Sequence, residues 1–148
     1  MIADDGSLHC WGLDDFGQLG NGPDGAPPEG DLVEVAEAGP WRWVSTGPAH
    51  ACAVDAAAAL WCWGSNEFGQ LGNGSAGTDA DPTTADSDVP IEVAGEQQWS
   101  SVAVGEAHSC AIDTDHQAWC WGPNASGSLG VGDQEDRSQP TAVVLPDL

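Results

Sequence analysis

The chain has 148 residues, enough for one ordinary domain. It has two basic residues (Lys or Arg) in total against 24 acidic residues (Asp or Glu), which gives a formal net charge of −22. The negative electrostatic field of such a chain repels phosphate backbones and anionic lipids, which excludes nucleic-acid binding through a basic face. We interpret the acidity as an aid to solubility, and the alternatives are that it binds cations or a basic partner. No apolar run reaches the about 18 residues that a membrane span needs, and the first residues lack the basic and apolar stretches of a signal peptide.

Short apolar stretches bounded by turn residues run along the chain, which has 20 Gly and 10 Pro. They are rich in Val, Ile, Trp and Cys, so we expect an all-β fold with tight turns. In chain order the expected strands are 8–12, 32–35, 41–45, 50–54, 60–64, 89–93, 99–104, 108–112, 118–122 and 140–145. The acidic tract 78–88 is expected to bulge into solvent, because added loop length costs little.

One five-residue phrase occurs three times, at Leu8–Gly12, Leu60–Gly64 and Ala118–Gly122, with spacings of 52 and 58 residues. A second phrase, Phe-Gly-Gln-Leu-Gly-Asn-Gly, follows the first two copies, and a looser version follows the third. Recurrence at near-constant spacing marks an array of copied supersecondary units. The expected units are approximately 11–62 and 63–120, with half units 1–10 and 121–148.

Large apolar side chains are consecutive in two expected strands, at Trp61–Trp63 and Trp119–Trp121. A strand with bulky groups on both faces must be covered on both faces. Four-stranded antiparallel sheets packed face to face around an axis provide that cover. We therefore predict a β-propeller fragment, a single domain over 1–148 with about two full four-stranded blades and half blades at each end.

Residues that recur at the same place in the units are interpreted as structural. They are Trp11, Gly12, His50, Trp63, Gly64, His108, Trp121 and Gly122. We expect the two histidines to hold turns by hydrogen bonds, and the glycines to bend a strand or make room for a ring. Gly47 and Gly105 lie between two strands and are expected to have positive φ, as tight reversals require.

Two cysteine pairs have the same ten-residue spacing, Cys52 with Cys62 and Cys110 with Cys120. Each pair lies across a hairpin, where opposed Cβ atoms are about 4.5–5.5 Å apart, so we predict two disulfides. Four buried free thiols are the alternative, and metal binding is disfavoured because only two sulfurs converge per blade. Cys10 is expected to be unpaired. The same offset places its partner one residue before the first, which predicts a chain that begins inside a hairpin.

The hairpin turn Asp4-Asp5-Gly6 suits a type I turn followed by a left-handed residue. Ala58 and His116 stand where Gly6 stands in the first hairpin, and a left-handed conformation costs each of them on the order of 1 kcal/mol. We expect a disulfide across each of these two hairpins to offset the weaker turn.

No catalytic, cofactor-binding or metal-binding residue is expected, and the chain is interpreted as non-enzymatic. No Ser/His/Asp or Cys/His triad stands out from the repeat, and the glycine-rich phrase lacks the Lys and the helix of a phosphate loop. The acidic tract has four Asp within ten residues. It lacks the Gly bend and closing Glu of a calcium loop, so a solvated loop is expected instead.

The segment Trp41-Arg42-Trp43 places one of the two cations between two indoles. Blade packing is the expected role, and stacking of Arg42 on an indole would stabilise by about 0.5–2 kcal/mol. Because Trp and Arg dominate the residues that bind protein partners, these three residues are also the candidate partner contact.

The string Trp63–Gly74, followed by Pro90, Val93 and then Val102–Ile112, resembles the regulator of chromosome condensation repeat. The paired-Cys variant that ends in Cys-Trp-Gly is similar to a bacterial, often surface-associated branch. The resemblance implies a seven-bladed propeller with four-stranded blades. Seven blades at this period would need roughly 360 residues. We therefore expect a piece of a longer propeller, or a product that must find partners.

The expected function is a non-enzymatic protein-interaction scaffold of a bacterial surface or secreted repeat protein, since propeller loops suit recognition. The expected partner is an unidentified protein, further repeats of the same protein, or a second copy. The location is expected to be extracellular or at the cell surface, with the cytoplasm as the alternative. The rival interpretations are a nucleotide-exchange regulator of a small GTPase, implied only by eukaryotic members, and a truncated gene fragment without independent function.

Overall fold

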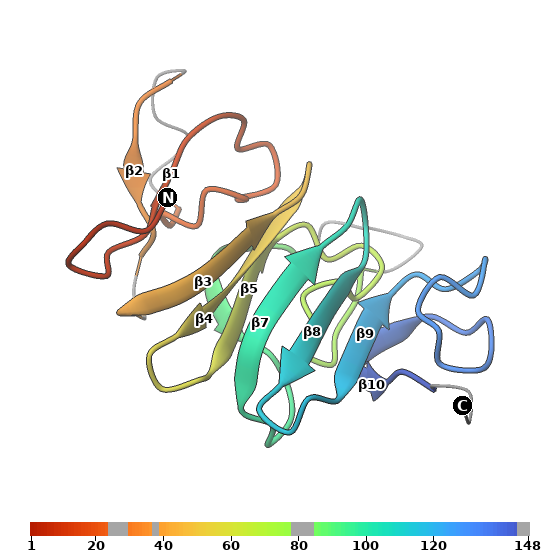
Figure 1. Cartoon of the computed structure of the whole chain (residues 1–148). Helices are drawn as coiled ribbons and strands as arrows, with labels where there is room; N and C mark the ends of the chain where they lie inside the picture. Colours follow the sequence, from red (N-terminus) through yellow and green to blue (C-terminus); the bar gives the residue numbers. More distant parts are fainter. Residues whose placement is uncertain (24–29, 37–38, 78–84, 145–148) are drawn as a thin grey trace.

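The computed structural model describes residues 1–23, 30–36, 39–77 and 85–144. These residues form three antiparallel sheets that follow one another like the blades of a fan, with the sheet of β3 to β6 in the middle (Figure 1). The strands are β1 His9–Cys10, β2 Val33–Glu34, β3 Trp41–Thr46, β4 His50–Asp55, β5 Leu60–Gly64, β6 Ser87–Glu92, β7 Trp99–Val104, β8 Ser109–Asp113, β9 Ala118–Gly122 and β10 Arg137–Ala142. The predicted partial propeller is confirmed. Within the described ranges, no helix is long and apolar enough to cross a membrane.

The sheets group the strands differently from the predicted units. β6 pairs with β5 and β10 pairs with β9, so each is the fourth strand of the sheet that precedes it in the chain. β10 thus completes the last blade, in place of the half blade expected at that end. At the N-terminal end a partial sheet remains, in which Ile2 bridges to Leu8 beside β1 and β2. The short segment 93–98 joins one complete blade to the next, whereas the longer segment 65–86 returns to its own sheet.

The middle strands are covered on both faces. Every residue of β4 is buried, and the side chains of Trp63 in β5 and Trp121 in β9 are fully buried. Trp41 packs on Trp63 with ring centroids 5.9 Å apart, and Trp99 packs on Trp121 at 6.1 Å. This double burial explains why the strands lack an alternation of apolar and polar residues.

Each blade junction joins a tryptophan to the glycine-rich phrase of the preceding unit. The indole N–H of Trp63 donates to the Gln18 carbonyl at 3.0 Å, and that of Trp121 donates to the Gln70 carbonyl at 2.8 Å. A Cβ on Gly72 would lie 2.6 Å from Trp121 Nε1, and Gly20 stands in the same relation to Trp63. The glycine-rich phrase of each unit therefore forms the surface on which the tryptophan of the next blade packs, and we call its contacting glycines, Gly20 and Gly72, the seat glycines.

Each hairpin turn has a residue in the left-handed conformation at the predicted position. Ala58 and His116 both have φ of 66°, and Gly6 has φ of 85°. An aspartate stabilises each glycine-free turn: Asp55 Oδ1 accepts from the backbone N–H groups of residues 57 and 59, and Asp113 Oδ1 accepts from those of 115 and 117. The first hairpin has Ala3 at this position and a glycine in the turn. The carboxylates therefore provide local support that we had expected from the disulfides alone.

The prediction for Gly47 and Gly105 was wrong, because neither has positive φ. Both are required by close packing instead. A Cβ on Gly47 would lie 2.5 Å from the Gly105 carbonyl of the next blade, and a Cβ on Gly105 would lie 2.6 Å from the His108 ring. Gly64 and Gly122 do bend the chain as expected, with φ of 102° and 112°.

Candidate interaction surfaces

The two predicted disulfides are present, and each cross-links the two central strands of a blade. Cys52 in β4 lies opposite Cys62 in β5, and Cys110 in β8 lies opposite Cys120 in β9. Cys10 is free and buried. Burial raises the pKa of the Cys10 thiol above its ordinary value, so this side chain is a weak nucleophile towards reagents in solution.

His50 connects two blades, rather than holding a turn as expected. Its Nε2 lies 2.9 Å from the Ser109 hydroxyl oxygen, and that hydroxyl lies 2.9 Å from the Gln70 carbonyl, to which it can donate. Burial, followed by the proximity of His108, lowers the pKa of His50 to about 4, so the ring is neutral at pH 7. The other ring nitrogen, Nδ1, is buried and has no hydrogen-bond partner in the described part of the chain.

The candidate partner contact Trp41-Arg42-Trp43 is divided by a β-bulge. The register of β3 against β4 shifts between Trp41 and Trp43, so Trp41 is buried while Trp43 is 49% exposed and Arg42 is exposed. The indole N–H of Trp43 donates to the Val102 carbonyl of the next blade at 2.8 Å. No stacking of Arg42 on an indole occurs among the described residues, whose ring contacts join tryptophans to one another.

Arg42 and Trp43 border a cavity of about 300 Å³ between the two complete blades, and we call this region the Arg42–Trp43 patch. Its further lining residues are Val54, Ala58, Trp99, Ser100 and Thr114. No ion pair involves Arg42 among the residues that the structure describes. The patch therefore combines a fixed, half-exposed indole with a cation that is available to a partner.

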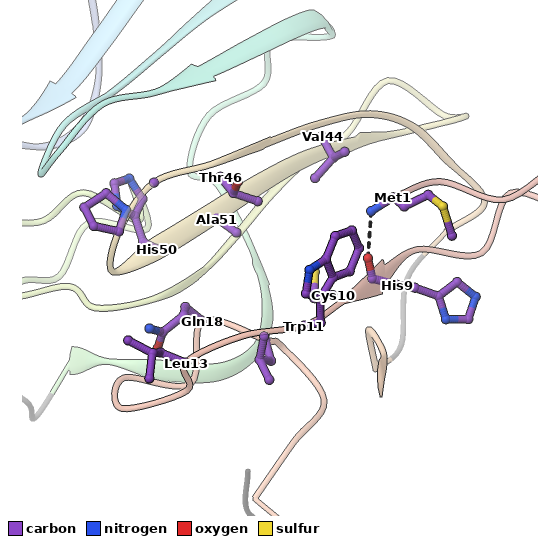
Figure 2. A pocket seen from close by; sticks show the side chains of 13 residues that line it. Met1, His9, Cys10, Trp11, Leu13, Gln18, Val44, Thr46, His50 and Ala51 are labelled. Atoms are coloured by element: carbon purple, nitrogen blue, oxygen red, sulfur yellow. Dashed lines mark hydrogen bonds between the residues drawn. The ribbon is translucent and has the colours of Figure 1, made fainter. Parts of the chain in front are cut away.

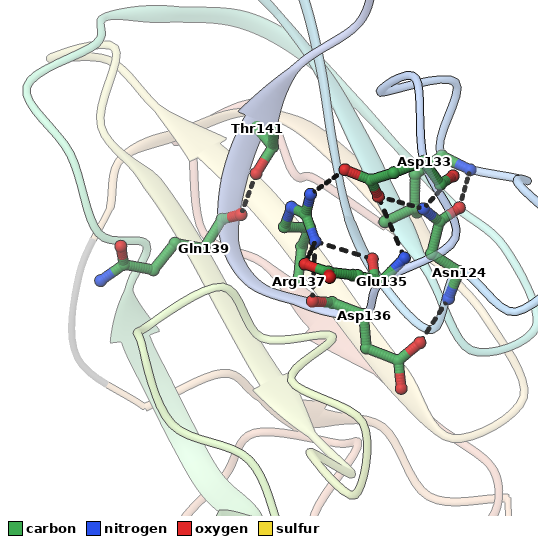
Figure 3. A network of polar contacts seen from close by, with 8 residues as sticks. Asn124, Asp133, Glu135, Asp136, Arg137, Gln139 and Thr141 are labelled. Carbon is green, nitrogen blue, oxygen red and sulfur yellow. Dashed lines mark hydrogen bonds and ion pairs between the residues drawn. The ribbon is translucent and has the colours of Figure 1, made fainter.

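The other cation, Arg137, is held within the chain. It forms an ion pair with Asp133 and donates to the Glu135 carbonyl at 2.9 Å (Figure 3). Asn124 donates through Nδ2 to the Asp133 carbonyl at 3.0 Å. Hydrogen bonds from the Glu135 backbone first, and then the charge of Arg137, lower the pKa of Asp133. Sequence analysis missed this network, for which the only signal was the four-residue spacing of Asp133 and Arg137.

Trp11 does not take the buried position of its counterparts. It is 56% exposed, whereas Trp63 and Trp121 are 0% exposed. It borders a cavity of about 510 Å³ between the partial sheet and the next blade, which we call the leading slot. Met1, His9 and Cys10 lie on one side of the slot, and Val44, Thr46 and His50 lie on the other (Figure 2).

The described residues gather no metal-binding cluster. No group of three or more His, Cys, Asp or Glu side chains could hold a metal ion within the described ranges. The acidic tract 78–88, the candidate calcium loop of the sequence, lies largely outside these ranges, since residues 78–84 are not described.

Models of the regulator of chromosome condensation (RCC1) repeat match residues 5–54 and 58–112, and a second RCC1 repeat model matches 44–70 and 99–128. The chain belongs to the RCC1 repeat family. It is similar to the "Ultraviolet-B receptor UVR8" of Arabidopsis thaliana, with 30% identity over 99% of this chain and 32% of that protein. It is also similar to the "Probable E3 ubiquitin-protein ligase HERC3" of Homo sapiens, with 34% identity over 97% of this chain and 13% of the ligase. The chain thus spans a third or less of these relatives.

Solved RCC1-type structures share the fold of this chain. Human WBSCR16 superposes with a TM-score of 0.78 at 24% identity, over 98% of this chain and 37% of that protein. Prp20p of Saccharomyces cerevisiae, described with its binding properties to Gsp1p and histones, gives 0.78 at 23% identity, over 97% of this chain and 35% of that protein. Identity at this level shows the fold alone.

Proposed function

We propose that this RCC1-repeat chain is a non-enzymatic protein-interaction scaffold that docks its partner on the Arg42–Trp43 patch. The observation that carries the proposal is the state of Trp43, whose ring is half-exposed while its indole N–H is already bonded to the Val102 carbonyl. A partner can bury such a ring without leaving a donor unpaired. Indole and guanidinium side chains are also the groups most enriched where binding energy concentrates.

Charge indicates the chemistry of the partner. The chain has a net charge of −22, so a protein with a basic surface would be attracted over a long range, and its association would slow as salt is added. A carboxylate of that partner would pair with Arg42 at the centre of the contact. Binding of proteins by relatives such as Prp20p is consistent with this role.

We propose an extracellular or cell-surface location of a bacterial cell for this scaffold. Disulfides persist in oxidising compartments and are rare in the cytosol, and the chain has two cross-strand pairs. Counting thiols after denaturation of the protein isolated from its source checks the proposal. One free thiol per chain supports it, and five free thiols favour the cytoplasm.

The interaction role is tested by affinity capture from an extract of the source cells. The bait is the intact chain, compared with Arg42→Ala, Trp43→Ala and the matched control Leu32→Ala, which removes an exposed apolar side chain outside the patch and outside the leading slot. We expect a protein that is retained by the wild type and the control but lost with both patch variants. Equal retention by all four baits would refute the patch. Stimulated nucleotide release from a small GTPase would favour the exchange regulator instead.

A further inference from the structure

The cavity of the Arg42–Trp43 patch lies at a junction between two complete four-stranded sheets. Arg42, Trp43 and Val54 belong to the middle blade, and Trp99 and Thr114 belong to the blade that follows it. The volume of about 300 Å³ is at the lower end of the range of ligand pockets, which is about 300–1,000 Å³. The cavity therefore has room for one residue or a small molecule of a partner, but not for a strand or a helix.

The buried residues that line this cavity are apolar. The side chains of Val54 and Trp99 are buried, and Ala58 is half-buried. The Trp43 ring is fixed at the same cavity, because its N–H donates to the Val102 carbonyl at 2.8 Å. An apolar side chain of a ligand can therefore leave water here without taking a hydrogen-bond partner from any of these groups.

The positive charge of Arg42 is not neutralised by the aspartates next to the lining residues in the chain. Asp55 and Asp113 each have one carboxylate oxygen bonded to backbone N–H groups of a hairpin. The other oxygen of each accepts from the indole N–H of the tryptophan six residues later, at 3.0 and 2.9 Å. No ion pair of Arg42 occurs in the described ranges. Its guanidinium is thus available to an anionic group that enters the cavity.

Two exposed hydroxyl groups line the cavity and can play different parts. Ser100 Oγ donates to the Ile112 carbonyl at 2.9 Å, which leaves its lone pairs to accept from a ligand. The Thr114 hydroxyl has no hydrogen bond to another described residue, so it can donate to a ligand. With Arg42, the cavity therefore offers donors for an anion, an acceptor for an N–H group, and apolar walls.

We propose that this cavity binds the C-terminal residue of a partner protein, an apolar residue with a free carboxylate; the proposal rests on the partner contact proposed above. The α-carboxylate and the side chain of such a residue are attached to the same carbon atom. One residue can therefore pair with the fork of Arg42, fill the apolar part of the cavity and donate its backbone N–H to Ser100 Oγ. An internal Asp or Glu would bring a carboxylate without an apolar side chain of its own.

Four short peptides and one amino acid test the proposal on the intact chain. The probe is acetyl-Lys-Gly-Leu with a free carboxylate, and its control is the same peptide with a C-terminal amide. The amide has one more positive charge, so the net charge of −22 favours the control, and a preference for the free acid must come from the cavity. Acetyl-Lys-Gly-Gly with a free carboxylate lacks the apolar side chain. Acetyl-Lys-Gly-Glu-Leu amide has its carboxylate on a side chain, and leucine alone is a free amino acid.

We expect the free acid to shift the Trp43 indole N–H resonance, assigned from Trp43→Phe, at concentrations at least about tenfold lower than the amide or the glycine-ended peptide. Arg42→Gln should remove this preference. The matched control Arg137→Gln changes the net charge by the same amount outside the cavity and should retain it. Equal responses to the acid and the amide, or no response to any probe, would overturn the proposal.

The remaining probes identify a different ligand for the cavity. If the glutamate-containing amide bound as tightly as the free acid, the ligand would be a side-chain carboxylate; if leucine did, it would be a free amino acid. Either result would overturn the terminal residue as the ligand. Loss of the captured protein with Arg42→Ala, without binding of the free acid, would keep the partner contact and reject this inference. Binding of the free acid with equal capture by all baits would refute the partner contact while the peptide site stands.

Discussion

The closed blade junctions and the leading slot use the same repeat positions, yet their tryptophans are in opposite environments. Trp121 is fully buried with its N–H bonded to the Gln70 carbonyl, whereas Trp11 is 56% exposed. The strand that carries each tryptophan has nearly the same sequence, Cys-Trp-Gly. Burial of a propeller tryptophan is therefore a property of the preceding glycine-rich turn as much as of its own strand. The expected effects of substitution follow from this difference.

Tryptophan truncation should give the largest contrast. Trp121→Ala removes a fully buried ring and should lower the free energy of unfolding by about 3–5 kcal/mol, as large-to-small core changes do. Trp11→Ala removes an exposed ring, and we expect a change of about 0.5 kcal/mol or less. Urea denaturation of the two variants measures the difference. Equal losses would mean that Trp11 is covered in solution.

Acidification should destabilise the closed junction through His50. Its pKa is about 4 in the folded chain against an ordinary value of 6.5, so the unfolded state binds the proton first as pH falls. Stability from this group is therefore complete above about pH 6.5 and is lost down to about pH 4, by about 3 kcal/mol at most. Unfolding free energies of the wild type and His50→Gln across this range check the prediction. Parallel pH profiles of the two proteins would contradict it.

Replacing a disulfide-bonded cysteine pair should lower the stability of the chain more than replacing the free Cys10. Replacing Cys110 and Cys120 together by Ala opens a ten-residue loop and should cost about 2–3 kcal/mol. Cys10→Ala breaks no cross-link, and we expect a loss of about 1 kcal/mol or less. Thermal unfolding under non-reducing conditions compares them, and a larger loss for Cys10→Ala would show that Cys10 has a bonded partner in solution.

The seat glycines allow the smallest and most specific comparison. Gly72→Ala and Gly130→Ala share a left-handed backbone, with φ of 71° and 67°, so each should lose about 1–2 kcal/mol for that reason. Only a Cβ on Gly72 would also meet an indole, at 2.6 Å, whereas the nearest atom to a Cβ on Gly130 would be Val143 Cγ1 at 3.4 Å. We expect Gly72→Ala to lose about 1–3 kcal/mol more than Gly130→Ala in urea denaturation. If the two variants lost the same free energy of unfolding, the contact between residue 72 and the Trp121 indole would not contribute to stability.

Sequence reasoning found the features that depend on local spacing. The ten-residue offset between Cys52 and Cys62 fixes both the hairpin and the disulfide, because opposed residues of a hairpin are symmetric about its turn. The left-handed Ala58 could be predicted from its alignment with Gly6. Its support by Asp55 could also have been found, since an Asp three residues before the left-handed position recurs in both glycine-free hairpins.

Features that depend on contacts between blades could not be found in the same way. The sheet that β6 joins is decided by which strand edge lies nearest, and neither segment length nor composition encodes that choice. Gly47 was assigned to a turn conformation because its real constraint, the Gly105 carbonyl, lies in another unit. The exposure of Trp43 follows from a bulge that no residue type in the segment marks.

Hydrogen exchange of the tryptophan indole N–H groups, followed by NMR on the intact chain, tests the blade junctions most directly. The Trp63 and Trp121 signals should be protected by their bonds to the Gln18 and Gln70 carbonyls, and the Trp11 signal should exchange at the rate of a free indole. If Trp121 exchanged as fast as Trp11, the seating of each blade's tryptophan on the preceding turn would be wrong.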